Sequence, residues 1–322
     1  MRANRSGGCA MGMATRTPAT VEEFLGYKQR FNNWGRWGDH DQFGTLNFIT
    51  PEVRRGASAL VREGRAISCA NPIQTRAVQP AEHRNNNPAD HQMRISATGS
   101  GDYIGLSFHG FVNTHIDALC HRFTEANGAL YNGKSISLVT ETGALSHSID
   151  QWRDGVVTRG VLYDIPRMRG ADYVSLDRPV EGWDLEDFAR THGIEPRAGD
   201  AVLIRSGDAP FWSANPDFVF TRPNDGLSTP GVAVSALEFL YEHDAAILAW
   251  DLQEAGNHGL PATVPLHEVT IPHMGMPMLD NANFERLAEA CAETGRYEFL
   301  FTVAPLVVMG GTGSPVNPIA ML

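Results

Sequence analysis

The chain has 322 residues, of which 42% are hydrophobic and 20% are charged. This is an ordinary composition for a soluble globular protein, and the length is ample for a buried core. The formal net charge of −11 argues against nonspecific binding to nucleic acid or to an anionic membrane surface. The four cysteines form no CxxC pair, and no apolar stretch approaches the ~20 residues of a membrane span. A cytoplasmic protein is therefore expected.

The first half of the chain shows two helix starts separated by irregular segments. Residues 1–19 lack an apolar core of signal-peptide length and are expected to form a flexible tail. A capping box at Thr20 and Glu23 predicts a short helix, and the run Thr50-Pro-Glu predicts the start of a second one. Residues 74–100 are polar and irregular, so they are predicted to form a long surface loop of the kind that often acts as a lid.

The second half of the chain alternates short apolar runs with helical patterns. The apolar runs are β-like in length and composition, and they cover residues 160–165, 201–205, 245–250 and 299–308. Amphipathic helices are predicted over residues 184–192, 234–243 and 283–293. This alternation predicts an α/β protein. Because no internal repeat or linker divides the chain, a single domain over residues 20–322 is expected.

The most informative segment runs from His109 to His121 and contains three histidines and one carboxylate. Residues of equal parity in a strand point to the same face, so His115 and Asp117 are predicted to project together. Such a pair is the local geometry of a metal site with nitrogen and oxygen ligands. His109 can join the pair only if the chain bends sharply after Gly110; otherwise it is an ordinary hydrogen-bonded strand histidine. His121 can fold back over the site if the strand turns after Asp117.

Four other groups of residues suggest chemistry less strongly. Cys120 could be a nucleophile, although a lone cysteine is more often a small buried hydrophobe. Residues 206–208 (Ser-Gly-Asp) could belong to a Ser-His-Asp hydrolase, but the Gly-x-Ser-x-Gly elbow is missing. Residues 310–313 lack the lysine of a P-loop, which favours a tight turn. Glu254 and His258 have the i, i+4 spacing of helix ligands, but the surrounding glycines oppose a helix, so His258 is kept as a candidate pocket residue.

The run Thr114-His115-Ile-Asp117-Ala-Leu-Cys-His121 resembles the core of the metal-dependent cyclase superfamily, whose pattern is His-x-Gly-Thr-His-x-Asp-x-x-x-His. That superfamily includes bacterial kynurenine formamidase, isatin hydrolase and trans-dienelactone hydrolase. Individually weaker similarities to its longer branch extend over most of the chain: Asn33-Trp-Gly-Arg-Trp-Gly, Gly44-Thr-Leu-Asn47, Tyr131-Asn-Gly133, Arg159-Gly-Val-Leu162 and Gly313-Ser-Pro315. The resemblance implies the swivelling β/β/α fold of the cyclase and kynurenine formamidase type, assembled as a homodimer or homotetramer.

The resemblance also implies a site that binds a divalent metal, Zn²⁺ or Mn²⁺. His121 would be the histidine that closes the motif. The family's first histidine falls on Phe111, and His109 lies two residues earlier, so His109 is a further candidate ligand and a single-metal site is expected. The resemblance implies His115 and Asp117 in the motif as metal ligands. It also implies His267 and Asp280, nearer the C-terminal end of the chain, as ligands.

The expected reaction follows from general metal chemistry. A bound Zn²⁺ or Mn²⁺ acidifies water and polarises a carbonyl group, and His121 would carry the proton. We therefore predict a hydrolase that opens an amide, imide or lactone bond of a small cyclic or aromatic substrate. Two alternatives stay open: a metal-dependent lyase or cyclase, and a member of the family that binds metal or ligand without catalysis. The side chains predicted to line the pocket are Trp34, Trp37, Phe48, Phe211, Trp212, Trp250 and His258.

Overall fold

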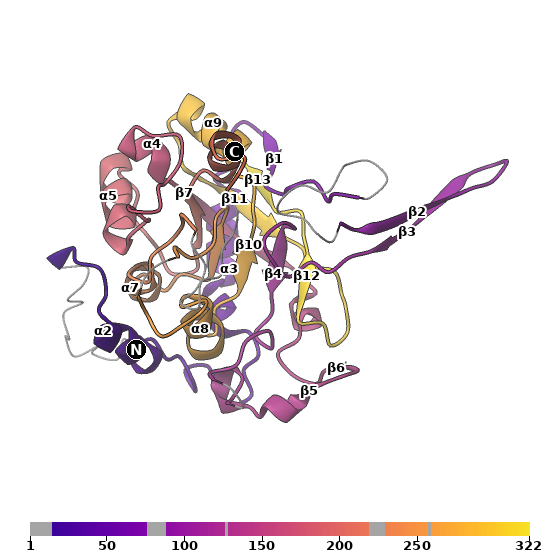
Figure 1. Cartoon of the computed structure of the whole chain (residues 1–322), viewed down its shortest axis with the longest axis horizontal. Helices are drawn as coiled ribbons and strands as arrows, with labels where there is room; N and C mark the ends of the chain where they lie inside the picture. Colours follow the sequence, from indigo (N-terminus) through magenta and orange to yellow (C-terminus); the bar gives the residue numbers. More distant parts are fainter. Residues whose placement is uncertain (1–14, 76–87, 126–127, 219–228, 257–258) are drawn as a thin grey trace.

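The computed structural model describes residues 15–75, 88–125, 128–218, 229–256 and 259–322 (Figure 1). Its centre is one mixed sheet with the strand order β1-β13-β11-β7-β8-β9-β10-β4-β12. From β7 to β10 neighbouring strands are parallel, whereas β4 and β12 are added antiparallel at one edge. The strands of this sheet are β1 (Ala66–Ser68), β4 (His115–Asp117), β7 (Val156–Asp164), β8 (Ala201–Arg205), β9 (Ile247–Trp250), β10 (Met278–Asp280), β11 (Glu298–Val303), β12 (Gly313–Pro315) and β13 (Ile319–Met321).

Helices cover the sheet and fill the connections between its strands (Figure 1). α3 packs against β7 and β11, while α5 and α9 contact β7 and α5 also contacts α7. The α-helices are α2 (Val21–Arg30), α3 (Pro51–Ser58), α4 (Ile165–Arg169), α5 (Gly182–His192), α6 (Asp208–Ala214), α7 (Ala236–Glu242), α8 (His267–Val269) and α9 (Glu285–Thr294). Shorter turns of helix are η1 (Gly44–Phe48), η2 (Tyr131–Gly133), η3 (Ile136–Leu138), η4 (Ile149–Trp152) and η5 (Thr270–Met274). No helix within the described ranges is long and apolar enough to cross a membrane.

The local signals read from the sequence predict these elements well. The capping box at Thr20 and Glu23 is present at the start of α2, and Thr50 caps α3 with Pro51 in its first turn. The apolar run at 201–205 is strand β8, and all five of its residues are buried. The run at 299–308 is a strand only as far as Val303, because the chain then leaves the sheet with Leu306 exposed.

Two predictions at the periphery have different outcomes. The surface loop predicted over residues 74–100 is wrong for its second part. From residue 90 to residue 105 the chain forms an antiparallel hairpin of β2 (Asp90–Ile95) and β3 (Ser100–Gly105). The alternation in this segment is weak in the sequence because neither face of the hairpin packs on the core. The predicted tail falls mostly outside the described residues, and at its described end Arg16 pairs with Asp187 at 2.7 Å. A second, shorter hairpin joins β5 (Val139–Thr140) to β6 (Gly143–Ala144).

Candidate metal centre

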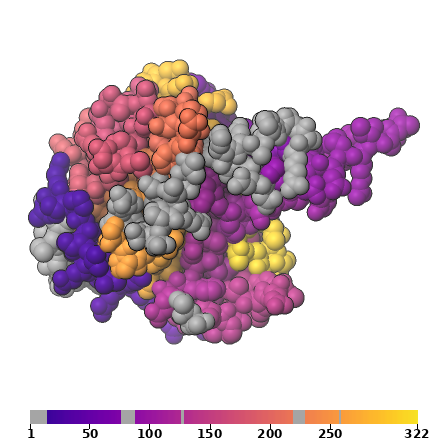
Figure 2. Space-filling model, viewed as in Figure 1, coloured from indigo at the N-terminus to yellow at the C-terminus, as the bar shows by residue number. Residues whose placement is uncertain are grey.

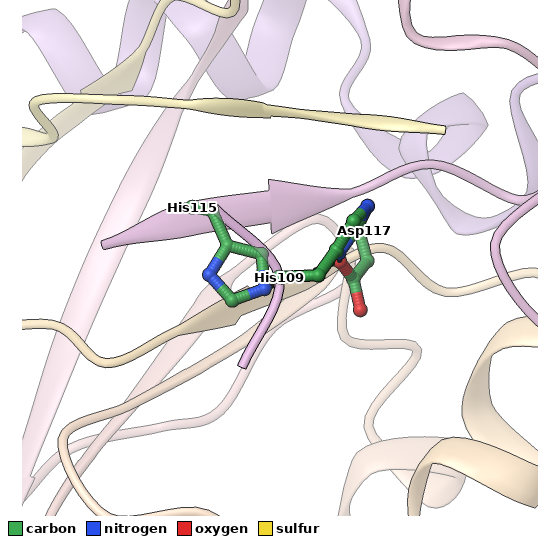
Figure 3. Close-up of side chains that lie close together, drawn as sticks. All are labelled: His109, His115 and Asp117. Carbon is green, nitrogen blue, oxygen red and sulfur yellow. Dashed lines mark ion pairs between the residues drawn. The ribbon is translucent and has the colours of Figure 1, made fainter. Parts of the chain in front are cut away.

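Strand β4 carries the two residues that the sequence places on one face. His115 and Asp117 both project from the same side of this strand, and each side chain is only 1% exposed (Figure 3). In the antiparallel pairing with β10, His115 lies directly opposite Asp280. Opposed residues of paired strands share a face, so the register adds the second carboxylate to the same side of the sheet. The distance from His115 Nε2 to Asp117 Oδ1 is 3.4 Å, and that to Asp280 Oδ2 is 3.9 Å.

A sharp bend before β4 brings His109 into the same space. Gly110 has a φ of 133°, a backbone conformation that residues with a side chain rarely adopt. The Gly110 carbonyl accepts hydrogen bonds from the side-chain amides of Gln253 and Asn281, which fix the bend. His109 Nδ1 then lies 2.9 Å from Asp117 Oδ1, while its Nε2 is 3.0 Å from Thr312 Oγ1. The bend required for His109 to join the site is therefore present (Figure 3).

The chain also turns directly after β4 and returns His121 to the site. The backbone amide of His121 donates to the carbonyl of Ala118 at 2.9 Å, which closes this turn. His121 Nε2 lies 3.6 Å from Asp117 Oδ2. Its ring stacks on that of His109 with centroids 4.0 Å apart and an interplanar angle of 11°. The two stacked imidazoles therefore form one wall beside the Asp117 carboxylate.

The C-terminal residues implied by the family resemblance complete the cluster. His267 begins α8, and its Nε2 lies 3.2 Å from Asp280 Oδ2 and 3.7 Å from Asp117 Oδ2. Glu254 Oε1 faces the other ring nitrogen, Nδ1, at 2.5 Å. All the candidate ligands chosen from the sequence thus lie around Asp117, although they come from two segments about 150 residues apart.

The chemistry of this cluster fits a bound cation. The Asp117 carboxylate is buried, and no hydrogen bond of good geometry reaches it from the described residues; its nearest contact is His109 Nδ1, 2.9 Å from Oδ1. A buried carboxylate is costly unless positive charge balances it, and a cation held by carboxylate and imidazole groups would supply that charge. Two sets of side chains could each hold a metal ion, and both contain Asp117: one adds His109 and His115, and the other adds His267 and Asp280. Within each set the ligand atoms lie within 4.8 Å of one another.

Neighbouring side chains orient the candidate ligands. The indole of Trp250 donates to Asp280 Oδ1 at 2.6 Å, and Gln253 donates to Asp280 Oδ2 at 2.9 Å. His115 Nδ1 lies 2.8 Å from the carbonyl oxygen of Asn113, which leaves Nε2 to face the site. Sequence reasoning did not find the roles of Gln253 and Asn113, because each depends on a contact created by folding. Trp250 lies under a ligand instead of lining the substrate pocket as predicted.

Burial and neighbouring charges shift the pKa values of three groups in the cluster. Burial opposes the ionisation of Asp117, but the imidazoles of His121, His109 and His115 outweigh it and hold the pKa of that carboxyl below its usual range. Burial also lowers the pKa of His121 to about 3, so its ring is uncharged at neutral pH. For His267 burial opposes the charged form, yet Glu254 and Asp280 outweigh it and raise its pKa.

The cluster opens into a cavity of about 440 Å³. Phe111 and Arg122 are part of its lining, and the buried Nε atom of Arg122 has no hydrogen-bond partner among the described residues. Phe111, which stands at the family's histidine position, therefore contributes to the cavity wall, while His109 approaches Asp117. The complete lining is His109, Gly110, Phe111, His115, Asp117, His121, Arg122, Gln253, Thr263, Val264, His267, Glu268 and Asp280.

The aromatic residues predicted to bind substrate do not line this cavity within the part of the chain that is described. Trp34 stacks on His273 and donates to the carbonyl of Pro272, so its ring is held elsewhere. Trp37 packs edge-to-face on Phe48. Both rings are thus engaged in local packing away from the described lining of this cavity, and their role in substrate binding stays a prediction.

The remaining predicted pocket residues lie on α6 or outside the description. Trp212 donates to Asp208 four residues earlier, and its ring packs against Phe211. Both residues are thus engaged within the α6 region and are absent from the described lining of the cavity. His258 lies outside the described residues.

The weaker candidates resolve in favour of structural roles. Cys120 is buried, and burial raises the pKa of its thiol to about 12, which opposes thiolate chemistry. The amides of residues 206–208 donate to the buried carboxylate of Asp251, so this segment is a fixed strand-to-helix turn. Gly310 pairs its carbonyl with the amide of Ala144 and forms part of a turn, as predicted. Glu254 contacts the ring of His267.

Comparison with known proteins agrees with the fold and the motif. The family model described as putative cyclase matches residues 44–255. A crystal structure of a novel cyclase is 28% identical, with a TM-score of 0.78 over 92% of this chain and 99% of that chain. None of the curated proteins compared matches the sequence.

Two isatin hydrolases share the fold at lower identity. One, bound to the product analogue thioisatinate, is 17% identical with a TM-score of 0.55, over 82% of this chain and 94% of that chain. Isatin hydrolase A from Labrenzia aggregata, bound to benzyl benzoate, is 21% identical with a TM-score of 0.55, over 83% and 95% of the two chains. The predicted single-domain α/β fold is confirmed by these likenesses.

Proposed function

The chain belongs to the putative cyclase family, and on that premise we propose that it is a metal-dependent hydrolase. The proposed reaction opens an amide, imide or lactone bond of a small cyclic or aromatic substrate. The observation that carries the proposal is the buried Asp117 carboxylate, which lies among candidate metal ligands in the lining of a cavity. Its surroundings supply the oxygen and nitrogen donors that Zn²⁺ and Mn²⁺ accept.

In such a reaction some side chains would hold the metal and another would transfer the proton. When bound, the divalent cation would supply Lewis-acid activation of the carbonyl and of a water molecule. His115, Asp117, His267 and Asp280 would hold it, with Glu254 fixing the ring of His267. We assign the proton transfer from the attacking oxygen to the leaving group to His121, because its Nε2 lies 3.6 Å from Asp117 Oδ2 and its ring lines the cavity.

The cavity also supports a substrate with a polar or anionic oxygen. Arg122 follows His121 in the chain and lines the same cavity, where its Nε atom lacks a partner. A buried donor without a partner is unfavourable, so a substrate oxygen that accepts from Arg122 would gain binding energy there. Phe111 provides an apolar surface in the same lining. This combination suits a flat ring that carries a carbonyl or carboxylate group.

A substrate screen under defined metal conditions tests the proposal. The purified protein would be loaded with Zn²⁺ or Mn²⁺ and assayed with formanilides, isatins and enol-lactones, beside a sample stripped with a chelator. We expect turnover of at least one of these classes by the loaded protein, none by the stripped protein, and recovery when metal is restored. A loaded protein that turns over none of them, yet binds metal stoichiometrically, would overturn the hydrolase and favour a binding protein.

A further inference from the structure

The described lining of the cavity contains one acidic residue that belongs to neither candidate ligand set, Glu268. It follows His267 on α8, and Thr263 and Val264 line the cavity beside it. Its side chain is 26% exposed, so it borders open space instead of being enclosed in the core. The carboxylate of Glu268 is therefore placed to contact a molecule that fills the cavity.

This carboxylate has acceptor capacity left for a ligand. Its Oε1 accepts the backbone amide of Thr263 at 3.2 Å, and its Oε2 lies 3.4 Å from Nζ of Lys28 on α2. In the space-filling view the indigo atoms of α2 adjoin the orange atoms of the part of the chain that includes α8 (Figure 2). An ionised carboxylate offers about four acceptor positions, which is more than these contacts use. A donor on the cavity side can therefore still bind to Glu268.

Lys28 restricts the charge that such a donor can carry. An ammonium group on the ligand would approach the carboxylate next to the ammonium of Lys28, and like charges close together repel each other. A neutral donor avoids this repulsion. It also gains a hydrogen bond to a charged acceptor, which is about twice as strong as a bond between neutral groups. The cavity therefore favours a neutral N–H group over a charged amine beside Glu268.

We propose that Glu268 is a specificity-determining residue that accepts a hydrogen bond from a neutral N–H group of the substrate. This inference rests on the proposed function, and it narrows the amide, imide or lactone substrates to those that carry an N–H group. A lactone presents only acceptor oxygens, which the carboxylate would repel. Arg122 lines the same cavity and supplies a donor. The two residues of opposite charge thus select a ring with both an N–H donor and an oxygen acceptor.

The size of the selectivity follows from the cost of leaving an acceptor without its donor. A closed site built to hydrogen-bond a substrate N–H group rejects an isostere that lacks this group by about 10,000-fold or more. Glu268 is partly exposed and already has two protein contacts, so water and those contacts reduce the cost. We therefore expect a preference of about 100-fold in kcat/KM. The carboxylate should carry this preference, and its ion pair with Lys28 should not.

Formanilide and phenyl formate test this selectivity by kinetics, because they differ only in an N–H group or an oxygen atom beside the carbonyl. Their intrinsic reactivities differ, but this difference cancels when the ratio of their kcat/KM values is compared between wild type and variant. In Glu268→Leu the ratio of formanilide to phenyl formate should fall about 100-fold. Lys28→Met is the matched control, because it breaks the same ion pair but keeps the acceptor, so its ratio should equal that of the wild type.

Each other kinetic outcome is decisive. An unchanged ratio in Glu268→Leu would overturn the proposal, as would an equal fall in Lys28→Met. If Glu268→Leu fails to fold, Glu268→Gln keeps the shape of the side chain and loses only the charge. Because a neutral acceptor forms a weaker hydrogen bond, this variant should lower the ratio about tenfold. An unchanged ratio in folded Glu268→Gln would count against the role of the carboxylate.

Binding of unreactive probes separates this inference from the proposed function. Oxindole and 2-indanone share their ring shape and carbonyl group, but oxindole has an N–H group where 2-indanone has CH₂. In titrations followed by ligand-observed NMR, the wild type should bind oxindole about tenfold more tightly, and Glu268→Leu should bind both probes equally. Equal binding to the wild type, or no binding of either probe, would overturn the role of Glu268 even in an active hydrolase. A preference for oxindole that Glu268→Leu abolishes, in a chain that hydrolyses no substrate, would support Glu268 and overturn only the hydrolase.

Discussion

The candidate metal centre has two halves that differ in how the fold holds them. Asp117 and Asp280 stand on paired strands, and His267 begins a helix; these side chains are at most 3% exposed. His109 and His121 lie on irregular segments before and after β4, with side chains 29% and 20% exposed. We call Asp117, Asp280 and His267 the strand half; neighbouring side chains hold their positions through a second layer of hydrogen bonds. We call His109 and His121 the loop half; their stacked rings face the cavity, which suits groups that act on the substrate or exchange protons.

The largest effect should follow from Asp117→Asn, because both possible ligand sets contain Asp117. The variant keeps the shape of the side chain but removes the negative charge between the imidazoles. Metal catalysis supplies several kcal/mol of transition-state stabilisation, so kcat/KM should fall at least about 1000-fold. Metal analysis and steady-state kinetics on the same sample would measure it. If the variant retains both metal and activity, Asp117 is not a metal ligand and the strand half does not hold the metal.

His121→Gln tests the loop half. We expect the variant to keep its metal, because His121 does not belong to either ligand set, while kcat falls about 100-fold or more through loss of the proton carrier. Metal content and kcat would be measured in parallel. If the metal is lost together with the activity, His121 is a ligand, and the proposed division between the two halves fails.

Glu254→Gln probes the layer behind the strand half. Its carboxylate orients the ring of His267, and losses of such outer partners typically reduce metal affinity about 10–100-fold. A competition titration with a chromogenic chelator would measure the change. Glu186→Gln is a matched control, because Glu186 contacts His243 at 2.8 Å in another pair that is not part of the described cavity lining. Equal metal affinity in the two variants would contradict the role of Glu254.

Arg122→Gln should give the smallest of these effects. The change removes the charge that faces the cavity and leaves the candidate ligands untouched, so KM should rise about tenfold with kcat nearly unchanged. The effect should be larger for a substrate with a carboxylate than for its neutral analogue. Arg153→Gln, at an exposed position on another element, should alter neither constant. An equal change for charged and neutral substrates would argue against anion recognition by Arg122.

The part of the site that lies on a strand could be predicted from the sequence better than the contacts between distant segments. His115 and Asp117 follow from the two-residue period of a strand, which is a local rule. His267 and Asp280 were inferred from the family resemblance. The register of β4 with β10 places Asp280 beside the first pair, and His267 reaches the same carboxylate from the start of α8. Local rules could not show that Glu254 turns to His267, because that contact depends on the packing of distant segments.

The periphery of the molecule was harder to predict for a related reason. The segment of β2 and β3 lacks a buried face, so its sequence resembles a loop although it forms a hairpin. Trp34 and Trp37 were expected in the pocket because aromatic residues are common there, yet both rings are held by local partners. Composition suggests what a pocket contains, but topology decides which residues reach it.

The central claim is that the buried Asp117 carboxylate holds a divalent cation. Metal analysis of the purified chain after metal loading and removal of excess ion tests it most directly, with His115→Ala as the companion variant and circular dichroism to show that both samples are folded. We predict at least one equivalent of divalent metal per wild-type chain and a large loss in His115→Ala. A folded wild type without stoichiometric metal, or a variant that retains as much metal as the wild type, would contradict the account.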